Sequence, residues 1–374
     1  MDAWQSREQP RRARVYRCQC ERAIFFRNSL CLGCGAALAY EPVLADIRAL
    51  VPGSAEGTWR LSGDAAAPRD YRRCANFHSP AGCNWLVAAE DAEPHCVACR
   101  LNRSIPDLSD ADNRRYWRSI ENAKRRLVAE LIALQLPVKS KIEDPERGIA
   151  FDLLRSPPEG PAVMTGHGGG LITLNIEEAD DANREKLRHA LHEPYRTLLG
   201  HFRHEIGHYY WDRLVAGTPW HERFRELFGD ERADYAAALH ANYETGPPAN
   251  WADRYISAYA SSHPWEDWAE TWAHFLHLYD GLDTAIGFGF TGKNVTMEIE
   301  PYALDDLYAP DDPEATRVLT LLNSWLALTT VLNEMARSLG QPDFYPFVTS
   351  RAVVRKLHFI HLVVKDAQSA AETT

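Results

Sequence analysis

The chain lacks an excess of basic residues, a long uninterrupted apolar stretch, and any cysteine after residue 99. Its formal charge is −11, which argues against a general nucleic-acid binder or a protein held on anionic membranes, because both need a basic surface. No run of roughly 18 apolar residues is free of charge, and residues 1–18 have no apolar signal-peptide region. We therefore expect a soluble, cytoplasmic protein without a membrane partner.

All eight cysteines fall between residues 18 and 99. In a reducing compartment, thiols crowded in this way are more typical of metal ligation than of disulfides. They form two groups of four: Cys18, Cys20, Cys31 and Cys34, and then Cys74, Cys83, Cys96 and Cys99. Each group contains one Cys-x2-Cys turn, a spacing that presents two thiolates to one zinc ion. The pattern predicts two structural zinc ions, and a single zinc or none are the alternatives.

Nearby glycines suit the turn of the first predicted zinc site, and nearby histidines are alternative ligands for the second. Gly33 and Gly35 suit the tight turn at the end of the first group, whereas its Cys-x-Cys arm is tighter than usual. His78 and His95 lie close enough in sequence to replace a cysteine in the second group. So polar a segment has too little apolar surface to fold without metal. Residues 1–105 are therefore predicted to form a zinc-ribbon domain.

Residues 106–374 are predicted to form a second domain, which makes the fold class α+β. Apolar residues recur at helical spacing from Asp110 onward, and the runs GIAFDLLRS and LITLNIEEAD indicate short strands of a small sheet. The second run is either an edge strand or an internal strand of that sheet. Two long apolar helices are expected in the last third. The later histidines are interpreted as structural: His274, His277, His358 and His361.

The segment HFRHEIGHYYWDRLV combines an amphipathic helix pattern with the order H-E-x-x-H at His204, Glu205 and His208. Residues four apart lie on the same helix face, so both imidazoles are spaced to bind one metal ion. Glu205 lies about 100° further round, where it reaches a water without binding the metal. Gly207 allows a close approach of a neighbouring element. The motif arises by chance in roughly 4 of 100 shuffled chains, so a third ligand is required.

Two acidic segments compete to supply that third ligand. The first is FGDERADYAAAL, and the second, YASSHPWEDWAETWAHFLHLYD, is predicted to be helical from about residues 262–264. Carboxylates among Trp, Phe and Leu are costly to bury unless they are paired or bound to metal, so the second segment is favoured. The favoured ligand is Glu266. The alternatives are Glu270, Asp230, Glu231 and Asp234.

The pairing of HEIGHYYW with HPWEDWAETWAHFL resembles the gluzincin metallopeptidases. With CNWL, RLNRSIPDLS and GQPDFYPF, essentially the whole chain resembles the zinc-binding metallopeptidases that carry an N-terminal zinc ribbon. Lethal-factor-type gluzincins have a similar E-x-x-A-E helix, which implies that Glu266 binds zinc and that Glu270 supports the site. The resemblance also implies that Tyr259, seven residues before Glu266, stabilises the tetrahedral intermediate, with Tyr255 as the substitute.

The expected function is hydrolysis of a peptide or isopeptide bond with one catalytic and two structural Zn2+ ions. Glu205 is the expected base, and a peptide or protein is the expected substrate. One alternative is a silent scaffold that binds zinc or peptide without turnover, although such a scaffold has no use for Glu205. Another is a zinc-ribbon recruitment protein, for which the arginines between residues 11 and 27 supply a basic end.

Overall fold

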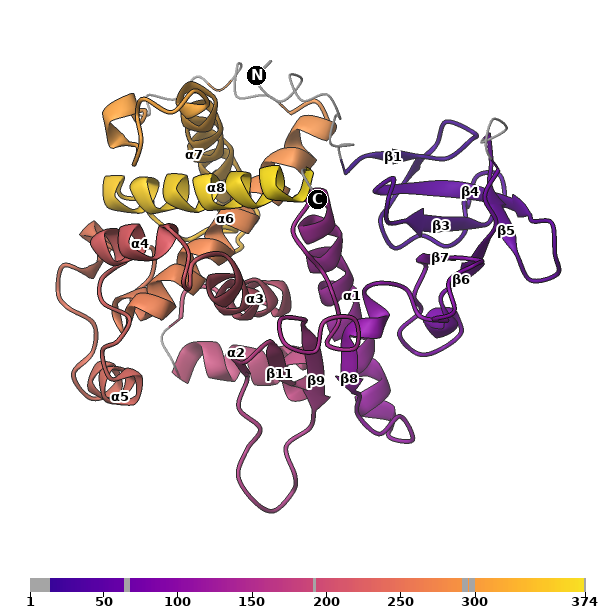
Figure 1. Ribbon diagram of the computed structural model, residues 1–374, viewed down its shortest axis with the longest axis horizontal. Coiled ribbons are helices and arrows are strands. Elements are labelled where there is room, and N and C mark those ends of the chain that lie inside the picture. Colours follow the sequence, from indigo (N-terminus) through magenta and orange to yellow (C-terminus); the bar gives the residue numbers. More distant parts are fainter. Residues whose placement is uncertain (1–13, 64–67, 191–192, 291–294, 296–299, 373–374) are drawn as a thin grey trace. The chain divides into compact units, whose positions relative to one another are not determined.

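The computed structural model contains two compact units (Figure 1). Of the residues that it describes, the N-terminal unit contains 14–63, 68–190 and 196–202, and the C-terminal unit contains 193–195, 203–290, 295 and 300–372. Strands occur in the N-terminal unit, and the described part of the C-terminal unit is helical. The predicted α+β class is confirmed. The domain boundary at residue 105 stays a prediction.

A five-stranded antiparallel sheet follows a short hairpin in the N-terminal unit. The hairpin pairs β1 (Tyr16–Arg17) with β2 (Ala23–Ile24). The sheet keeps sequence order: β3 (Leu38–Glu41), β4 (Asp46–Pro52), β5 (Trp59–Leu61), β6 (Tyr71–Arg73) and β7 (Leu86–Ala88). Its buried face carries Ala39, Leu50, Leu61, Tyr71 and Leu86. This core is small, as expected of a segment that depends on metal for stability.

A second sheet has the order β10-β11-β9-β8. Its strands are β8 (Asn102–Ser104), β9 (Ala150–Leu154), β10 (Gly166–Gly168) and β11 (Leu171–Asn175). β11 is parallel to β9 and antiparallel to β10, so the run LITLNI forms an internal strand and not a sheet edge. The helices of this unit are α1 (Ala111–Ala133) and α2 (Asp181–Ala190). α1 begins where predicted, because the Asp110 carboxylate accepts hydrogen bonds from the first amides of the helix.

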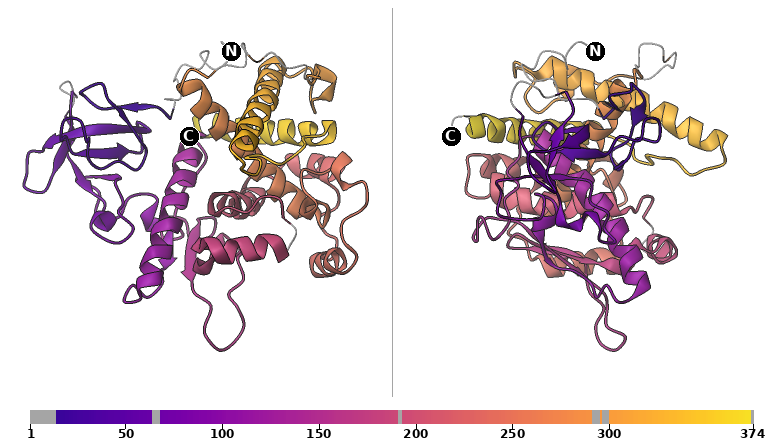
Figure 2. Two further views of the ribbon diagram at one scale, coloured as in Figure 1. Left: turned by 180° about the vertical axis from the view of Figure 1, so that it is seen from behind. Right: turned by 90° about the vertical axis from the view of Figure 1, so that its right-hand side faces the viewer.

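The boundary between the units falls within α3 (Leu198–Leu214). The further helices of the C-terminal unit are α4 (Trp220–Phe228), α5 (Tyr235–Thr245), α6 (Pro264–Gly287), α7 (Ala315–Ser338) and α8 (Arg351–Glu372). α6 is the central helix, since it is buried over most of its length and packs against both α7 and α8 (Figure 2). A buried ion pair joins Lys356 Nζ of α8 to Asp267 Oδ2 of α6 at 2.6 Å.

Helices α3 and α6 approach each other closely at Gly207. A Cβ atom at this position would lie 3.0 Å from Ala269 Cα and 3.2 Å from Trp272 Cβ. The indole nitrogen of Trp268 donates a 2.9 Å hydrogen bond to the Gly207 carbonyl oxygen. Tyr210, one turn further along α3, stacks on Trp272 with 5.0 Å between ring centroids. The missing side chain at Gly207 therefore sets the distance between the two helices that carry the predicted catalytic metal ligands.

Among the described helices, α7 alone is long and apolar enough to cross a membrane by length and composition. In the structure, 39% of its most apolar stretch is buried. Core helices of water-soluble proteins meet the same criterion, so a single such helix is weak evidence for a membrane span.

Candidate metal centres

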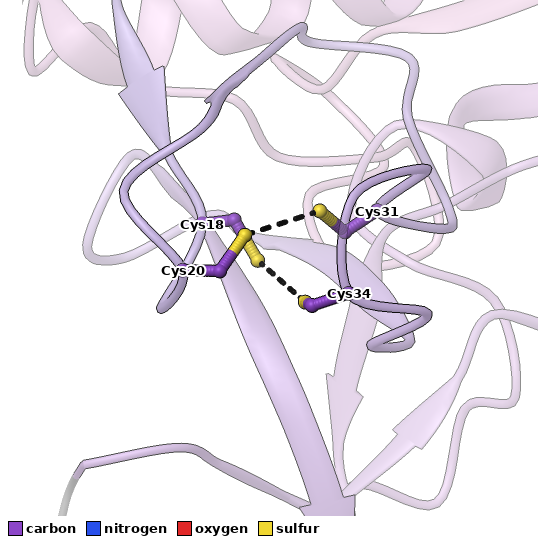
Figure 3. Close-up of side chains that lie close together, drawn as sticks. All are labelled: Cys18, Cys20, Cys31 and Cys34. Carbon is purple, nitrogen blue, oxygen red and sulfur yellow. Dashed lines mark hydrogen bonds between the residues drawn. The ribbon is translucent and has the colours of Figure 1, made fainter.

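The first cysteine group brings four thiols from two turns to one point (Figure 3). Cys18 and Cys20 lie between β1 and β2, and Cys31 and Cys34 lie on the turn that follows β2. Cys18 Sγ is 3.6 Å from Cys34 Sγ, and Cys20 Sγ is 3.7 Å from Cys31 Sγ. A tetrahedron with zinc–sulfur bonds of about 2.3 Å places its sulfurs about 3.8 Å apart. The group therefore has the dimensions of a four-thiolate zinc site.

The backbone of the Cys31–Cys34 turn favours the thiolate form. Hydrogen bonds from the amides of Cys34 and Gly33 lower the pKa of the Cys31 thiol to about 6. Gly35 has a φ of 72°, a left-handed conformation that glycine adopts without strain. At Gly33, a Cβ atom would collide with the side chain of Arg22, which lies across this turn. The backbone conformation thus favours glycine at position 35, whereas a side chain at position 33 would only have to displace the side chain of Arg22.

The second cysteine group is fully buried. Cys83 Sγ is 3.6 Å from Cys96 Sγ, and all four sulfurs lie within 4.8 Å of one another: Cys74, Cys83, Cys96 and Cys99. The guanidinium of Arg125 on α1 is also buried. Burial alone lowers the pKa of Arg125, but the negative charges of Cys83 and Glu121 raise it above its usual value. A positive charge at this point offsets part of the negative charge of four thiolates.

Neither histidine considered for this group joins it. His95 Nδ1 lies 2.9 Å from Glu93 Oε1, and the His78 ring packs edge-on against Phe77 at 4.7 Å. The four cysteines complete the second group without them.

The third cluster brings His204 and His208 of α3 together with Glu266 of α6. His204 Nε2 is 3.2 Å from His208 Nε2 and 3.0 Å from Glu266 Oε2, and His208 Nε2 is 3.5 Å from Glu266 Oε1. Ligands at about 2.0–2.1 Å from a tetrahedral zinc ion are about 3.3 Å apart. The two imidazole nitrogens and the carboxylate of Glu266 thus have the separations that one zinc ion requires, and three protein ligands would leave a fourth position for water.

Glu266 carries a buried oxygen that lacks a hydrogen bond. The residue is only 1% exposed, and among the described residues no donor is aligned with its Oε2 atom, although His204 Nε2 is near. An unsatisfied buried carboxylate oxygen is costly unless a cation compensates it. The donor set and this oxygen both fit a divalent metal.

Glu270, one helical turn after Glu266, orients the first histidine. His204 Nδ1 lies 2.7 Å from Glu270 Oε1, and Ser257 Oγ donates a 2.6 Å hydrogen bond to Glu270 Oε2. A proton held on Nδ1 leaves the lone pair of Nε2 directed at the cluster. In the metal-free cluster, burial acts to lower the pKa of His204, but Glu266 and Glu270 outweigh it and raise that pKa well above its usual value, so a metal ion bound at Nε2 would displace a proton. Glu270 is thus placed behind a candidate metal ligand.

Three further side chains lie at this cluster. Glu205 is 8% exposed and lies on the turn between the two histidines. The Tyr259 ring is 6.0 Å from that of His204, and burial, followed by the charge of Glu266, raises the pKa of its hydroxyl far above the usual value. The Tyr235 hydroxyl donates a 2.7 Å hydrogen bond to Glu266 Oε1. Sequence reasoning missed Tyr235, because a tyrosine that opens an exposed helix carries no recognisable signal.

The competing candidates have other partners. Glu231 accepts hydrogen bonds from Arg225 and lies 2.9 Å from His221 Nε2, whereas Asp230 pairs with Arg232. Asp234 caps α5 through a hydrogen bond from the Ala237 amide. The substitute tyrosine, Tyr255, has the Lys356 ammonium over its ring at 4.5 Å.

The histidines interpreted as structural are all held by neighbouring side chains or backbone. His274 Nδ1 lies 2.7 Å from the Tyr345 hydroxyl, and burial lowers the pKa of His274 to about 4. His277 Nδ1 contacts Arg203 at 2.6 Å. In α8, His361 contacts the Tyr279 hydroxyl and His358 accepts a hydrogen bond from the Ala309 amide.

Two cysteine groups, followed by a helical unit with a histidine–glutamate cluster, define a class of zinc-binding proteins. Residues 15–110 match a zinc-ribbon domain. Residues 113–363 match the family described as "Putative zinc-binding metallo-peptidase", and the chain belongs to that family.

Similar proteins occur in mycobacteria. Uncharacterized proteins of Mycobacterium bovis and of two strains of Mycobacterium tuberculosis are each 43% identical to the chain over 351 residues, which is 93% of this chain and 94% of each relative. No solved structure is significantly similar to it.

Proposed function

We propose that the chain is a zinc-dependent hydrolase of peptide or isopeptide bonds with a gluzincin-type site. The observation that carries the proposal is the cluster of His204, His208 and Glu266, whose ligand atoms are 3.0–3.5 Å apart around a buried carboxylate oxygen without an aligned donor. Glu205 lies within the same helical turn. A site that only binds metal needs the three ligands but has no use for this fourth acidic residue.

When bound at this cluster, zinc supplies a Lewis acid that makes water acidic enough to react at neutral pH. The Glu205 carboxylate takes the proton from the attacking water and then passes it to the leaving amine. Glu205 suits this role because its position on α3, one residue after His204, brings it beside the cluster without making it a ligand.

Tyr259 stabilises the negative charge that develops on the carbonyl oxygen. A tyrosine hydroxyl is protonated at neutral pH, and burial raises the pKa of Tyr259 further, so the hydroxyl can donate a hydrogen bond. A donor that meets the oxygen only as charge develops lowers the activation barrier more than it strengthens substrate binding. Glu270 keeps His204 in the tautomer that leaves Nε2 free.

The proposed metal content is one catalytic and two structural zinc ions, and the proposed substrate is a peptide or protein. Eight free thiols fit a reducing compartment such as the cytoplasm. The negative net charge gives no support for nucleic acid or an anionic membrane as a partner.

The test begins with zinc content per chain for the wild type and for the double variant His204→Ala, His208→Ala. The proposal expects about three zinc ions, which fall to about two in the variant. A peptide library is then incubated with the wild type, with Glu205→Gln as the inactive control. Equal zinc contents in both proteins after zinc loading would contradict the proposal, and so would cleavage that persists in Glu205→Gln.

A further inference from the structure

The helix that carries Tyr235 is poorly packed. We define the α5 segment as residues 232–250, all of which are exposed or half-buried. Within α5, the half-buried residues are Ala238, Leu239 and Asn242, which share one face of the helix with Tyr235. Isolated helices of this length are marginal in water, so α5 depends on contacts that it makes only in part. Its separation from the rest of the C-terminal unit is therefore expected to cost little free energy.

The backbone around the α5 segment allows it to move as a piece. Gly246, at the end of α5, has a φ of 75°, and nothing lies within 4 Å of a Cβ atom placed there. Gly229, just before the segment, has a φ of 108°. Between them, Glu231 is anchored by its contacts with Arg225 and His221. The chain thus has a fixed point immediately before the segment and a conformationally permissive residue within it.

Tyr235 connects this segment to the proposed catalytic cluster. Besides its hydrogen bond to Glu266 Oε1, its ring packs edge-on against His263 at 5.2 Å. Burial raises the pKa of the Tyr235 hydroxyl above its usual value, the charges of Glu266 and Glu205 add to this effect, and a hydrogen bond with Tyr259 opposes it. Tyr235 thus lies among the ligand, the base and the oxyanion-stabilising residue of the proposed mechanism.

We propose that the α5 segment is a lid over the metal cluster, and that Tyr235 is a positioning residue that latches the lid to Glu266. The proposal rests on the proposed function, because it concerns the same site. In the closed state the Tyr235 hydroxyl donates a hydrogen bond to Glu266 Oε1, the oxygen 3.5 Å from His208 Nε2, and leaves Oε2 beside His204 Nε2 as the oxygen that would hold a metal ion. Opening the lid breaks this bond, frees Oε1 and uncovers Glu205 and Tyr259.

The geometry also restricts how a substrate enters. We infer that a peptide reaches the cluster between the half-buried face of α5 and the α3–α6 pair, where Tyr235 is bonded to Glu266 when the lid is closed. An extended peptide segment fits this requirement, since the polypeptide replaces the partly missing contacts of Ala238, Leu239 and Asn242. Substrate binding and lid position are therefore coupled through one tyrosine.

The test uses the full-length protein and the variant Tyr235→Phe, which removes only the hydroxyl. Hydrogen–deuterium exchange of the α5 amides in metal-free protein is expected to be about tenfold faster in the variant, the factor that corresponds to the loss of one hydrogen bond. Zinc dissociation from the third site, followed with a chromophoric chelator, is expected to be about 10- to 100-fold faster. The double variant His204→Ala, His208→Ala supplies the signal of the two cysteine sites alone.

The matched control is Tyr302→Phe, because the Tyr302 hydroxyl donates a 2.6 Å hydrogen bond to the Thr349 carbonyl elsewhere in the C-terminal unit. This control is expected to keep wild-type exchange in α5 and wild-type zinc release. Equal α5 exchange in the two variants would overturn the proposal, as would faster exchange with unchanged zinc release. The exchange experiment needs no catalysis, so an inactive protein with a Tyr235-dependent lid would refute the proposed function and leave the latch standing.

Discussion

The cysteine groups and the histidine–glutamate cluster gather their ligands in different ways. Each cysteine group draws four thiols from turns close together in the chain, whereas Glu266 reaches His204 and His208 from a separate helix. Four thiolates fill the coordination shell of zinc, but two imidazoles and one carboxylate leave a position open. We infer that the turns of the N-terminal unit suit a zinc ion that stabilises the fold. The helix pair of the C-terminal unit suits a zinc ion that takes part in a reaction.

The largest expected effect is the removal of a buried thiol. Cys83→Ser is expected to lose one zinc ion and to unfold the N-terminal unit, because structural zinc contributes about 10–16 kcal/mol to small zinc domains. Zinc analysis and limited proteolysis measure this outcome. His95→Ala is the control, since His95 contacts Glu93 outside the cysteine group. A folded, protease-resistant Cys83→Ser protein would contradict a structural role for the zinc ion of the second cysteine group.

The second-largest expected effect is the loss of the proposed catalytic base, Glu205. Glu205→Gln is expected to lower the rate of peptide cleavage by about 10²- to 10⁴-fold and to leave zinc content unchanged, because Glu205 moves a proton and binds no metal. Cleavage assays and metal analysis on the same sample measure both quantities. Loss of the third zinc ion from this variant would instead identify Glu205 as a ligand.

A smaller effect is expected when Glu270, which lies behind the candidate metal ligand His204, is removed. Glu270→Ala removes the acceptor for His204 Nδ1 and is expected to weaken zinc binding at the third site about 10- to 100-fold. Competition with a chelator measures the affinity, and the two cysteine sites serve as internal references. An unchanged affinity would mean that the orientation of His204 is set elsewhere.

The smallest effect is a pH dependence of stability at Glu231. Its hydrogen bonds from Arg225 act against burial and lower its pKa to about 2. A carboxyl group with a lowered folded-state pKa stabilises the protein above its unfolded pKa of about 4.5, and this stabilisation is lost as the pH falls toward 2. Glu231→Gln is therefore expected to cost about 1–3 kcal/mol at neutral pH and progressively less below pH 4.5. Chemical denaturation at several pH values tests this, and a pH-independent difference would contradict it.

Much of the architecture was predictable because its signals are local. Cysteine spacing identified both four-thiol groups, and the carboxylate of Asp110 marked the start of α1. The H-E-x-x-H order located two residues of the third cluster, His204 and His208, and the cost of burying a carboxylate in an aromatic helix favoured Glu266 over the acidic residues near 230.

What could not be predicted depends on contacts between distant segments. The internal position of β11 follows from its pairing with β10, a strand whose glycines give no strand signal of their own. Tyr235 meets Glu266 because the chain between α4 and α6 brings the start of α5 to the first turn of α6. No periodicity in the sequence encodes a contact of that kind.

Gly207 has one more consequence, which concerns how the site is able to change over evolution. The coordination distances depend on the spacing of α3 and α6, and that spacing is fixed by a position where a single added carbon would lie 3.0 Å from Ala269 Cα. Substitutions on the outer faces of the two helices are free to accumulate without altering the ligand geometry. The proposed metal site is therefore insulated from surface variation, whereas one methyl group at the helix crossing would require α3 and α6 to shift relative to each other.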